Sequence, residues 1–218
     1  MPSTRTKSFL RGSRYLFFIM GILALSYCSW VLLDARLYQA YQTRLFQQEL
    51  KDSQLSHGNR EPVHTSPLPP LEEARAARGQ SLGMSRDGRA PLGRIEISTI
   101  GVAAMILEGT DNKTLRRAVG HIPGTPLPGQ PGNVALAGHR DTFFRALQNI
   151  RENDEITLET LSGPYRYRVD SIKVVDPEDT EALHDSDDAI LTLVTCYPFF
   201  FVGPAPRRFV VQARRIPQ

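Results

Sequence analysis

The sequence predicts a small, mainly β domain of the barrel type with short helices, preceded by one N-terminal transmembrane helix. Three observations lead to this fold class. Residues 15–33 contain no charged side chain, residues 34–89 are polar and rich in proline, and from residue 90 short apolar runs alternate with turn signals. The 218 residues therefore divide into an N-terminus (1–14), a membrane segment (15–33), a stalk (34–89) and a folded domain (90–218).

The charge of the chain is unevenly distributed. Its net charge is +3, and residues 1–33 hold no acidic residue and four basic ones, Arg5, Lys7, Arg11 and Arg14. Removing these four from the 26 Lys and Arg leaves 22 against 23 Asp and Glu, a net charge of −1. The basic excess belongs to the N-terminus, so the sequence does not indicate nucleic-acid binding. With only two cysteines, Cys28 and Cys196, it also excludes a disulfide framework and a cysteine-rich zinc site.

The apolar run from Tyr15 to Leu33 is long enough to cross a bilayer. Its 19 residues span roughly 28 Å as a helix. Because the basic residues precede it, the positive-inside rule predicts a cytoplasmic N-terminus and an extracytoplasmic domain on the plasma (inner) membrane. A cleaved signal peptide is the alternative, but the run is long and ends in Trp-Val-Leu-Leu-Asp without a small-residue cleavage site.

The stalk has two parts. Residues 34–51 are polar and helix-tolerant, so we expect the membrane helix to continue outward to about Lys51. Residues 52–89 contain Pro62, Pro67, Pro69 and Pro70 among Ser, Gly and His, which favours an extended linker.

The folded domain shows the periodicity of strands. Strand candidates are LGRIEISTIG, VAAMILEGT, NVALAG, DEITLETL, YRYRVDSIKVVD, ILTLVTC and RFVVQAR. Seven or eight strands over roughly 130 residues, with turns between them, favour a small mixed or antiparallel barrel over βαβ winding. The segment NKTLRRAVG is predicted as a helix ending at Gly120, and RDTFFRALQNI as a helical turn.

Cys196 is the candidate for chemistry, because it stands where an apolar strand ends and a loop begins. A buried structural thiol is the alternative interpretation. A catalytic thiol needs a neighbouring imidazole or guanidinium that favours the thiolate and orients it. His139 also ends a buried strand, so the two residues can meet at one end of a barrel, whereas His121 opens a Pro/Gly loop and His184 lies in an acidic stretch.

The segments NVALAGHRDTFFRAL and LTLVTCYPFFFVGPAPRRFVVQA, which place Cys196 57 residues after His139, closely resemble the sortases. These are cysteine transpeptidases of bacterial surfaces. The Thr-Leu-x-Thr-Cys type of strand, the Gly-His strand end and an arginine that opens the strand after the cysteine loop carry the resemblance. The Cys-Tyr-Pro-Phe continuation and the Gly-Pro-Ala-Pro loop look most like class D. The resemblance covers about residues 90–215 and implies an eight-stranded β-barrel with short helices.

The resemblance also implies roles for single residues. Cys196 matches the nucleophile and His139 the general acid/base. The family's arginine begins the final strand; Arg207 and Arg208 both stand there, but successive residues of a strand face opposite ways. We choose Arg208, which directly precedes Phe-Val-Val.

Two further residues keep alternatives open. Thr195 is a tentative substrate-binding residue or packs between strands, and we favour packing. Asp141 orients the His139 ring as a third triad member or caps the turn that follows, and we favour the cap.

The function implied by the resemblance is transpeptidation. Cys196 cleaves a sorting signal similar to Leu-Pro-x-Thr-Gly or Leu-Pro-x-Thr-Ala in surface proteins, and the acyl group passes through a thioester to an amine acceptor, such as a cell-wall or pilin-type nucleophile. The alternatives are a membrane-anchored cysteine hydrolase with the same residues and a non-catalytic surface barrel. Some sortases use calcium, but the acidic loops here form no calcium motif, so we expect neither a cofactor nor a required metal.

Overall fold

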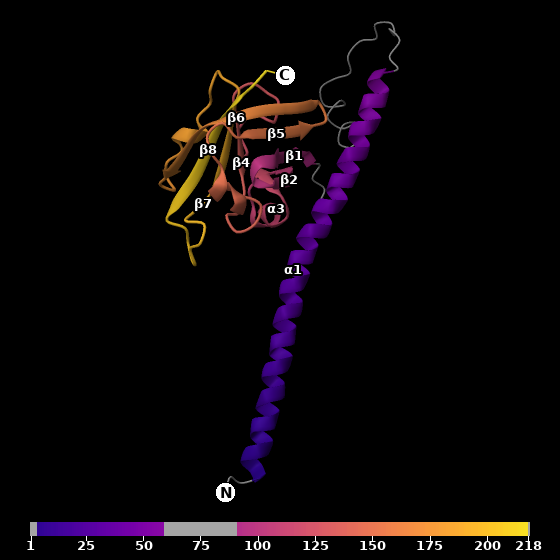
Figure 1. Cartoon of the computed structure of the whole chain (residues 1–218), viewed down its shortest axis with the longest axis vertical. Coiled ribbons are helices and arrows are strands. Elements are labelled where there is room, and N and C mark those ends of the chain that lie inside the picture. The colour runs from indigo at the N-terminus through magenta and orange to yellow at the C-terminus, as the bar shows by residue number, and fades with distance from the viewer. Residues whose placement is uncertain (1–3, 59–90, 218) are drawn as a thin grey trace. The chain divides into compact units, whose positions relative to one another are not determined.

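Eight strands close into a barrel in the computed structural model, which describes residues 4–58 and 91–217 (Figure 1). Around the barrel the order is β1-β2-β3-β4-β7-β8-β6-β5, and β5 pairs with β1 to close it. The strands are β1 (Pro91–Ile97), β2 (Val102–Glu108), β3 (Val119–His121), β4 (Asn133–Ala137), β5 (Glu155–Thr160), β6 (Gly163–Val175), β7 (Ile190–Tyr197) and β8 (Arg207–Arg215). The predicted mainly β barrel is confirmed.

Two of the strand pairs are parallel, β2 with β3 and β4 with β7, and the others are antiparallel. Short helices fill the connections: η1 (Ser98–Ile100), α3 (Asn112–Arg117), η2 (Arg145–Asn149) and η3 (Glu181–Leu183). The first turn of α3 is held by the Asp111 side chain, which accepts hydrogen bonds from the amides of Lys113 and Thr114.

The interior of the barrel is filled by one face of each long strand. On β7 these residues are Leu191 and Leu193, and on β8 they are Val211 and Ala213, all fully buried in a single core cluster. Because side chains alternate between the two faces of a strand, this pattern decides which residues of β7 and β8 point out of the barrel.

One predicted element is wrong. The segment NKTLRRAVG forms the helix α3 only as far as Arg117, and Gly120 lies in β3 instead of ending a helix. A side chain at Gly120 would be 2.3 Å from the Gly109 carbonyl oxygen, so the close approach of β3 to the end of β2 explains this glycine.

The N-terminal helix α1 runs from Thr4 to Gly58, past the helix end expected near Lys51. The chain divides into two compact units, Met1–Tyr38 and Gln39–Gln218. Within the second unit, the Gln39 side chain accepts a hydrogen bond from the Met105 amide at 2.9 Å and donates one to the Arg117 carbonyl oxygen. The predicted linker residues 59–89 lie outside the described residues.

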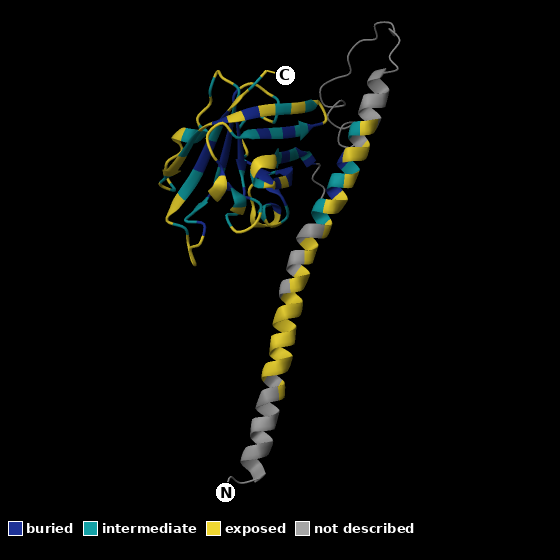
Figure 2. Ribbon diagram, in the orientation of Figure 1, coloured by how far each residue is buried: buried dark blue, intermediate teal, exposed yellow. Residues whose placement is uncertain are grey.

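The segment from Tyr15 to Leu33 lies within α1, and every side chain described there is exposed (Figure 2). The side chains at positions 16, 28, 31 and 32 are not among those described. Among the residues that are described, no helix has a stretch long and apolar enough to span a membrane.

Candidate functional site

The pairing of β7 with β8 sets Cys196 directly opposite Arg208. The next pair along the ladder joins Tyr197 to Arg207. Directly opposite residues of an antiparallel pair project to the same face, and neighbouring pairs project to opposite faces. Arg208 therefore shares a face with Cys196, whereas Arg207 shares the other face with Tyr197.

The face that Cys196 and Arg208 share is the outer one. Leu191 and Leu193 point into the core, so Cys196 has the opposite parity, and Arg208 stands in the same relation to Val211. Both side chains are half-buried, which leaves them accessible to a ligand on the outside of the barrel.

The pairing of β4 with β7 brings His139 to the same level. This parallel register holds from Asn133 and Ile190 to Ala137 and Val194, always 57 positions apart. The Gly138 amide extends it by donating to the Val194 carbonyl oxygen at 3.1 Å. Continued by one residue more, the register sets His139 level with Cys196, and the His139 side chain is half-buried too.

The glycine before His139 is required by packing. A side chain at Gly138 would lie 2.7 Å from the ring of Phe144, which is fully buried in the core. Phe144 comes from the turn that follows His139, and its amide donates to the His139 carbonyl oxygen at 3.2 Å. The Gly-His sequence thus lets the chain leave β4 and fold back over its own end.

Thr195 points into the structure and away from the outer face. It is 3% exposed, and its Oγ1 donates to the Gly138 carbonyl oxygen at 2.7 Å. The hydroxyl thus ties β7 to the residue before His139, which is the contact expected of a packing role. Asp141 is exposed. In the turn that contains it, the His139 carbonyl oxygen accepts the hydrogen bonds from the Thr142 and Phe144 amides.

The Arg208 guanidinium is partly held by backbone. Its Nη1 donates to the carbonyl oxygens of Ala205 at 3.4 Å and Arg207 at 3.2 Å. A guanidinium carries five N–H donors, so the Nε and Nη2 groups add three more to those of Nη1. Arg207, in contrast, is exposed and lies 3.8 Å from Asp176 in a surface ion pair.

Three aromatic rings support the strand ends from the side opposite Cys196. Tyr197, Phe199 and Phe209 lie with ring centroids 5.1–6.2 Å apart, in stacked and edge-to-face arrangements. Tyr197 and Phe209 are the chain neighbours of Cys196 and Arg208. Packing of their rings fixes the backbone from which the two functional side chains project.

The other histidines of the folded domain have different surroundings. His121 is 2% exposed, with Nδ1 2.8 Å from Glu108 Oε2 and Nε2 2.9 Å from the Pro126 carbonyl oxygen. Both ring nitrogens of the buried His121 therefore lie at hydrogen-bond distance from oxygen atoms, and the ring is a structural element. His184 is exposed.

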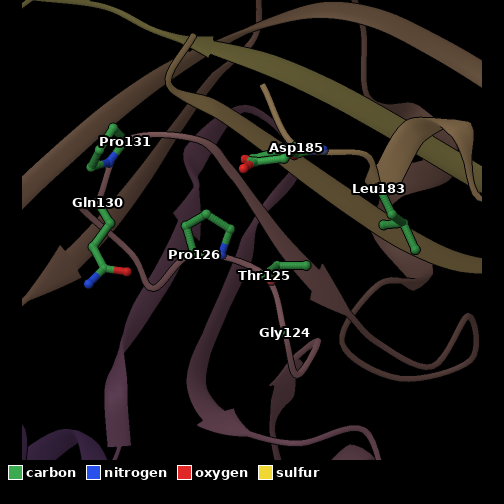
Figure 3. Close-up of a pocket in the computed structure, with 8 residues that line it drawn as sticks. Gly124, Thr125, Pro126, Gln130, Pro131, Leu183 and Asp185 are labelled. Carbon is green, nitrogen blue, oxygen red and sulfur yellow. The ribbon is translucent and has the colours of Figure 1, made fainter. Parts of the chain in front are cut away.

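A cavity of about 550 Å³ is lined by residues other than His139, Cys196 and Arg208 (Figure 3). Its walls come from the connection before β4 and from the segment after η3, and its lining residues are Gly124, Thr125, Pro126, Gln130, Pro131, Asn133, Leu183 and Asp185. Asn133 opens β4, whereas His139 follows its end. The Asn133 amide donates to the carbonyl oxygens of Ala182 and His184, so it already has partners within the fold.

We therefore place the candidate site at His139, Cys196 and Arg208. Among the residues that the structure describes, no group of three His, Cys, Asp or Glu side chains could hold a metal ion. The geometry offers a thiol, an imidazole and a guanidinium on adjacent strand ends. This set suits covalent catalysis at a carbonyl carbon, with the guanidinium as oxyanion donor.

Comparison with known proteins agrees with this fold. Residues 95–216, more than half of the chain, match the Sortase domain family, and the chain belongs to the sortase family. Sortase D of Bacillus subtilis (strain 168) is 37% identical over 127 residues, which cover 57% of this chain and 63% of that protein. The predicted family is confirmed, and its relatives include class D members.

Solved structures of sortases share the fold. A Clostridium perfringens Sortase D5 transpeptidase matches with a TM-score of 0.56 and 27% identity, over 80% of this chain and 99% of that chain. Sortase C-1 from Actinomyces oris matches with a TM-score of 0.55 and 31% identity, over 79% and 98%. The chain spans less than two thirds of Bacillus subtilis Sortase D (63%) and of Bacillus anthracis Sortase A (60%).

The geometry predicts a reactive thiol. In a Cys28→Ser background, we expect iodoacetamide to alkylate Cys196 of the folded protein at neutral pH, because a neighbouring imidazole base activates a thiol as a nucleophile. His139→Ala should slow alkylation by about tenfold or more, whereas His184→Ala should leave it unchanged. The rate is measured by peptide mass mapping. An inert Cys196, or equal alkylation rates with and without the His139 side chain, would contradict the placement of His139 beside Cys196.

Proposed function

We propose that this protein is a cysteine transpeptidase that cleaves a sorting signal in surface proteins and transfers the acyl group to an amine. The observation that supports this best is the strand register, with Cys196 opposite Arg208 and level with His139. Membership of the sortase family supports the same reaction class. The substrate motif, similar to Leu-Pro-x-Thr-Gly or Leu-Pro-x-Thr-Ala, comes from the resemblance of the segments around His139 and Cys196.

In the first half of the reaction, the Cys196 thiolate attacks the carbonyl carbon of the Thr residue in the signal. A C–S bond forms, and negative charge develops on the carbonyl oxygen. Arg208 donates to this oxyanion, for which a permanently charged, forked guanidinium is well suited. As the C–N bond breaks, the His139 imidazolium gives its proton to the leaving amine, and the acyl group remains on Cys196 as a thioester.

In the second half, an amine acceptor attacks the thioester. His139 takes the proton from this amine, the new C–N bond forms, and the C–S bond breaks to restore the Cys196 thiolate. Arg208 again faces the oxyanion. Each group returns to its starting state, and no step uses a metal, so we propose that neither calcium nor another cofactor is required.

The hydrolase alternative uses the same residues and differs only in the acceptor, which is water. A panel of fluorogenic sorting peptides, with and without a primary amine, separates the two. We expect cleavage of Leu-Pro-x-Thr peptides and, with the amine present, a product that carries it at the Thr carboxyl, both unchanged by EDTA. Cleavage that yields only the free acid at saturating amine supports the hydrolase, and absence of cleavage supports a non-catalytic barrel.

The two adjacent arginines provide a matched pair of variants. Arg208→Ala should lower the turnover of a sorting peptide about 100- to 1000-fold, because an oxyanion donor is lost. Arg207→Ala should lose little, since its ion pair with Asp176 is exposed and 3.8 Å long. Arg208→Lys should restore only part of the loss, because an ammonium lacks the planar fork.

Circular dichroism of each arginine variant controls for folding. The assignment of the oxyanion donor to Arg208 is wrong if Arg207→Ala is the crippled variant or if both alanine variants keep their activity.

We also propose that the protein is anchored in the plasma (inner) membrane by residues 15–33, with its N-terminus in the cytoplasm. Two observations support this. The run is uncharged and preceded by four basic residues, and its described side chains are exposed along α1. An exposed helical surface made of large apolar side chains such as Phe17, Phe18 and Ile22 is costly in water and favoured in hydrocarbon.

Protease accessibility tests this topology. Protease added to intact spheroplasts should digest the domain after Asp34, because the positive-inside rule places it outside, while a cytoplasmic marker stays intact. Lysis with detergent should expose both. A domain that survives together with the marker in intact spheroplasts would reverse the orientation.

A further inference from the structure

Arg140 follows His139 directly and binds the loop that connects the other two site residues. This loop, residues 198–206, runs from the end of β7, which carries Cys196, to the start of β8, which carries Arg208. The Arg140 guanidinium donates to three of its carbonyl oxygens: Nη1 to Pro198 at 3.0 Å, and Nη2 to Phe201 at 2.7 Å and Gly203 at 3.0 Å. One half-buried side chain thus ties the histidine segment to the cysteine–arginine loop.

These three contacts suit a guanidinium and no other side chain. A guanidinium presents five N–H donors in a rigid plane, so it can satisfy several carbonyl oxygens that lie around one point. An ammonium has three donors on a flexible stem and is more strongly hydrated. The Arg140 guanidinium carbon also lies over the ring of Phe201, 5.8 Å from its centroid, which adds a cation–π contact.

The backbone around His139 is held on both sides. Before it, the Gly138 carbonyl oxygen accepts from Thr195 Oγ1, and the Gly138 amide donates to Val194. After it, the Arg140 side chain is bound to three carbonyl oxygens of the β7–β8 loop. The middle of the loop is open to solvent, with Phe200, Phe201 and Val202 exposed, whereas Phe199 is buried in the core. Loss of Arg140 therefore leaves the loop without its three hydrogen bonds to the histidine segment.

We propose that Arg140 is a positioning residue, which aligns His139 with Cys196 and Arg208 through the β7–β8 loop without touching the substrate. This role rests on the proposed transpeptidase function. Misplacement of a catalytic group by about 1 Å costs on the order of 100-fold in rate. Arg140 therefore contributes to the chemical steps, and its loss affects kcat far more than KM.

Arg145 provides the matched control. It lies in η2, is exposed, and places its guanidinium carbon 5.0 Å from the ring centroid of Phe200, a residue of the same loop. Arg145→Ala removes a positive charge and a ring contact with the loop, whereas Arg140→Ala removes a positive charge, a ring contact and three hydrogen bonds to carbonyl oxygens of the loop. A larger effect in Arg140→Ala than in Arg145→Ala is therefore not explained by the loss of a positive charge or of a ring contact.

The test uses the full chain in detergent, with a Cys28→Ser background for alkylation. We expect Arg140→Ala to lower kcat for a sorting peptide by about 100-fold with KM changed less than about threefold, and Arg140→Lys to recover only a small part. Arg145→Ala should stay within about threefold of the parent. The pH profile of Cys196 alkylation should become that of His139→Ala in Arg140→Ala and remain unchanged in Arg145→Ala.

The alkylation profile needs no substrate, so it separates this inference from the proposed function. If the parent protein cleaves no peptide, the proposed function is wrong. An alkylation profile of Arg140→Ala that matches the profile of His139→Ala still supports the positioning role. An unchanged profile in Arg140→Ala overturns it, and so does a loss of kcat that merely follows the folded fraction measured by circular dichroism. If Arg140→Ala does not fold, Arg140→Lys, which keeps the charge, carries both readouts.

Discussion

The site depends on the register of β7 with its two neighbours. The pairing of β7 with β8 sets Cys196 opposite Arg208, and the pairing of β4 with β7, continued past Ala137, brings His139 to the same level. Because side chains alternate along a strand, a slip of one residue on β8 would replace Arg208 by Arg207 at this place. The packing that fixes the register, with Leu191 and Leu193 against Val211 and Ala213, is therefore also what sets the chemistry.

The interior side chains near the site connect the core to the strand ends that carry His139, Cys196 and Arg208. Thr195 bonds the Gly138 carbonyl oxygen, Phe144 fills the space that a side chain at Gly138 would need, and the rings of Tyr197 and Phe209 pack beside their functional neighbours. Each outward-facing functional residue thus has an inward-facing chain neighbour that is held by packing or by a hydrogen bond. Covalent catalysis requires rigid support of this kind, since the reaction rate falls steeply when the catalytic groups are misaligned.

The sequence predicted most of the barrel, because alternation of apolar and polar residues marks strands with one buried face. It missed β3, whose three residues are all buried and too few to show a period. Cys196 and His139 could be found from their positions at strand ends. Pleat alternation showed only that one of Arg207 and Arg208 can face Cys196, and the choice of Arg208 came from the resemblance to the family's strand. Arg140 could not be assigned a role, because its partners are backbone carbonyl oxygens, which leave no trace in the sequence. The contact of buried His121 with Glu108 was hidden for a similar reason, since it depends on the parallel pairing of β2 with β3.

A cross-strand disulfide tests the central claim most directly. Opposite residues of an antiparallel pair lie about 4.5–5.5 Å apart between Cα atoms, within the range that a disulfide spans. In a Cys28→Ser background, we expect mild oxidation of Arg208→Cys to form an internal disulfide with Cys196, measured as the loss of two thiols by mass spectrometry. Arg207→Cys should keep both thiols, because it faces the opposite side. A disulfide in Arg207→Cys and none in Arg208→Cys would contradict the register on which the site rests.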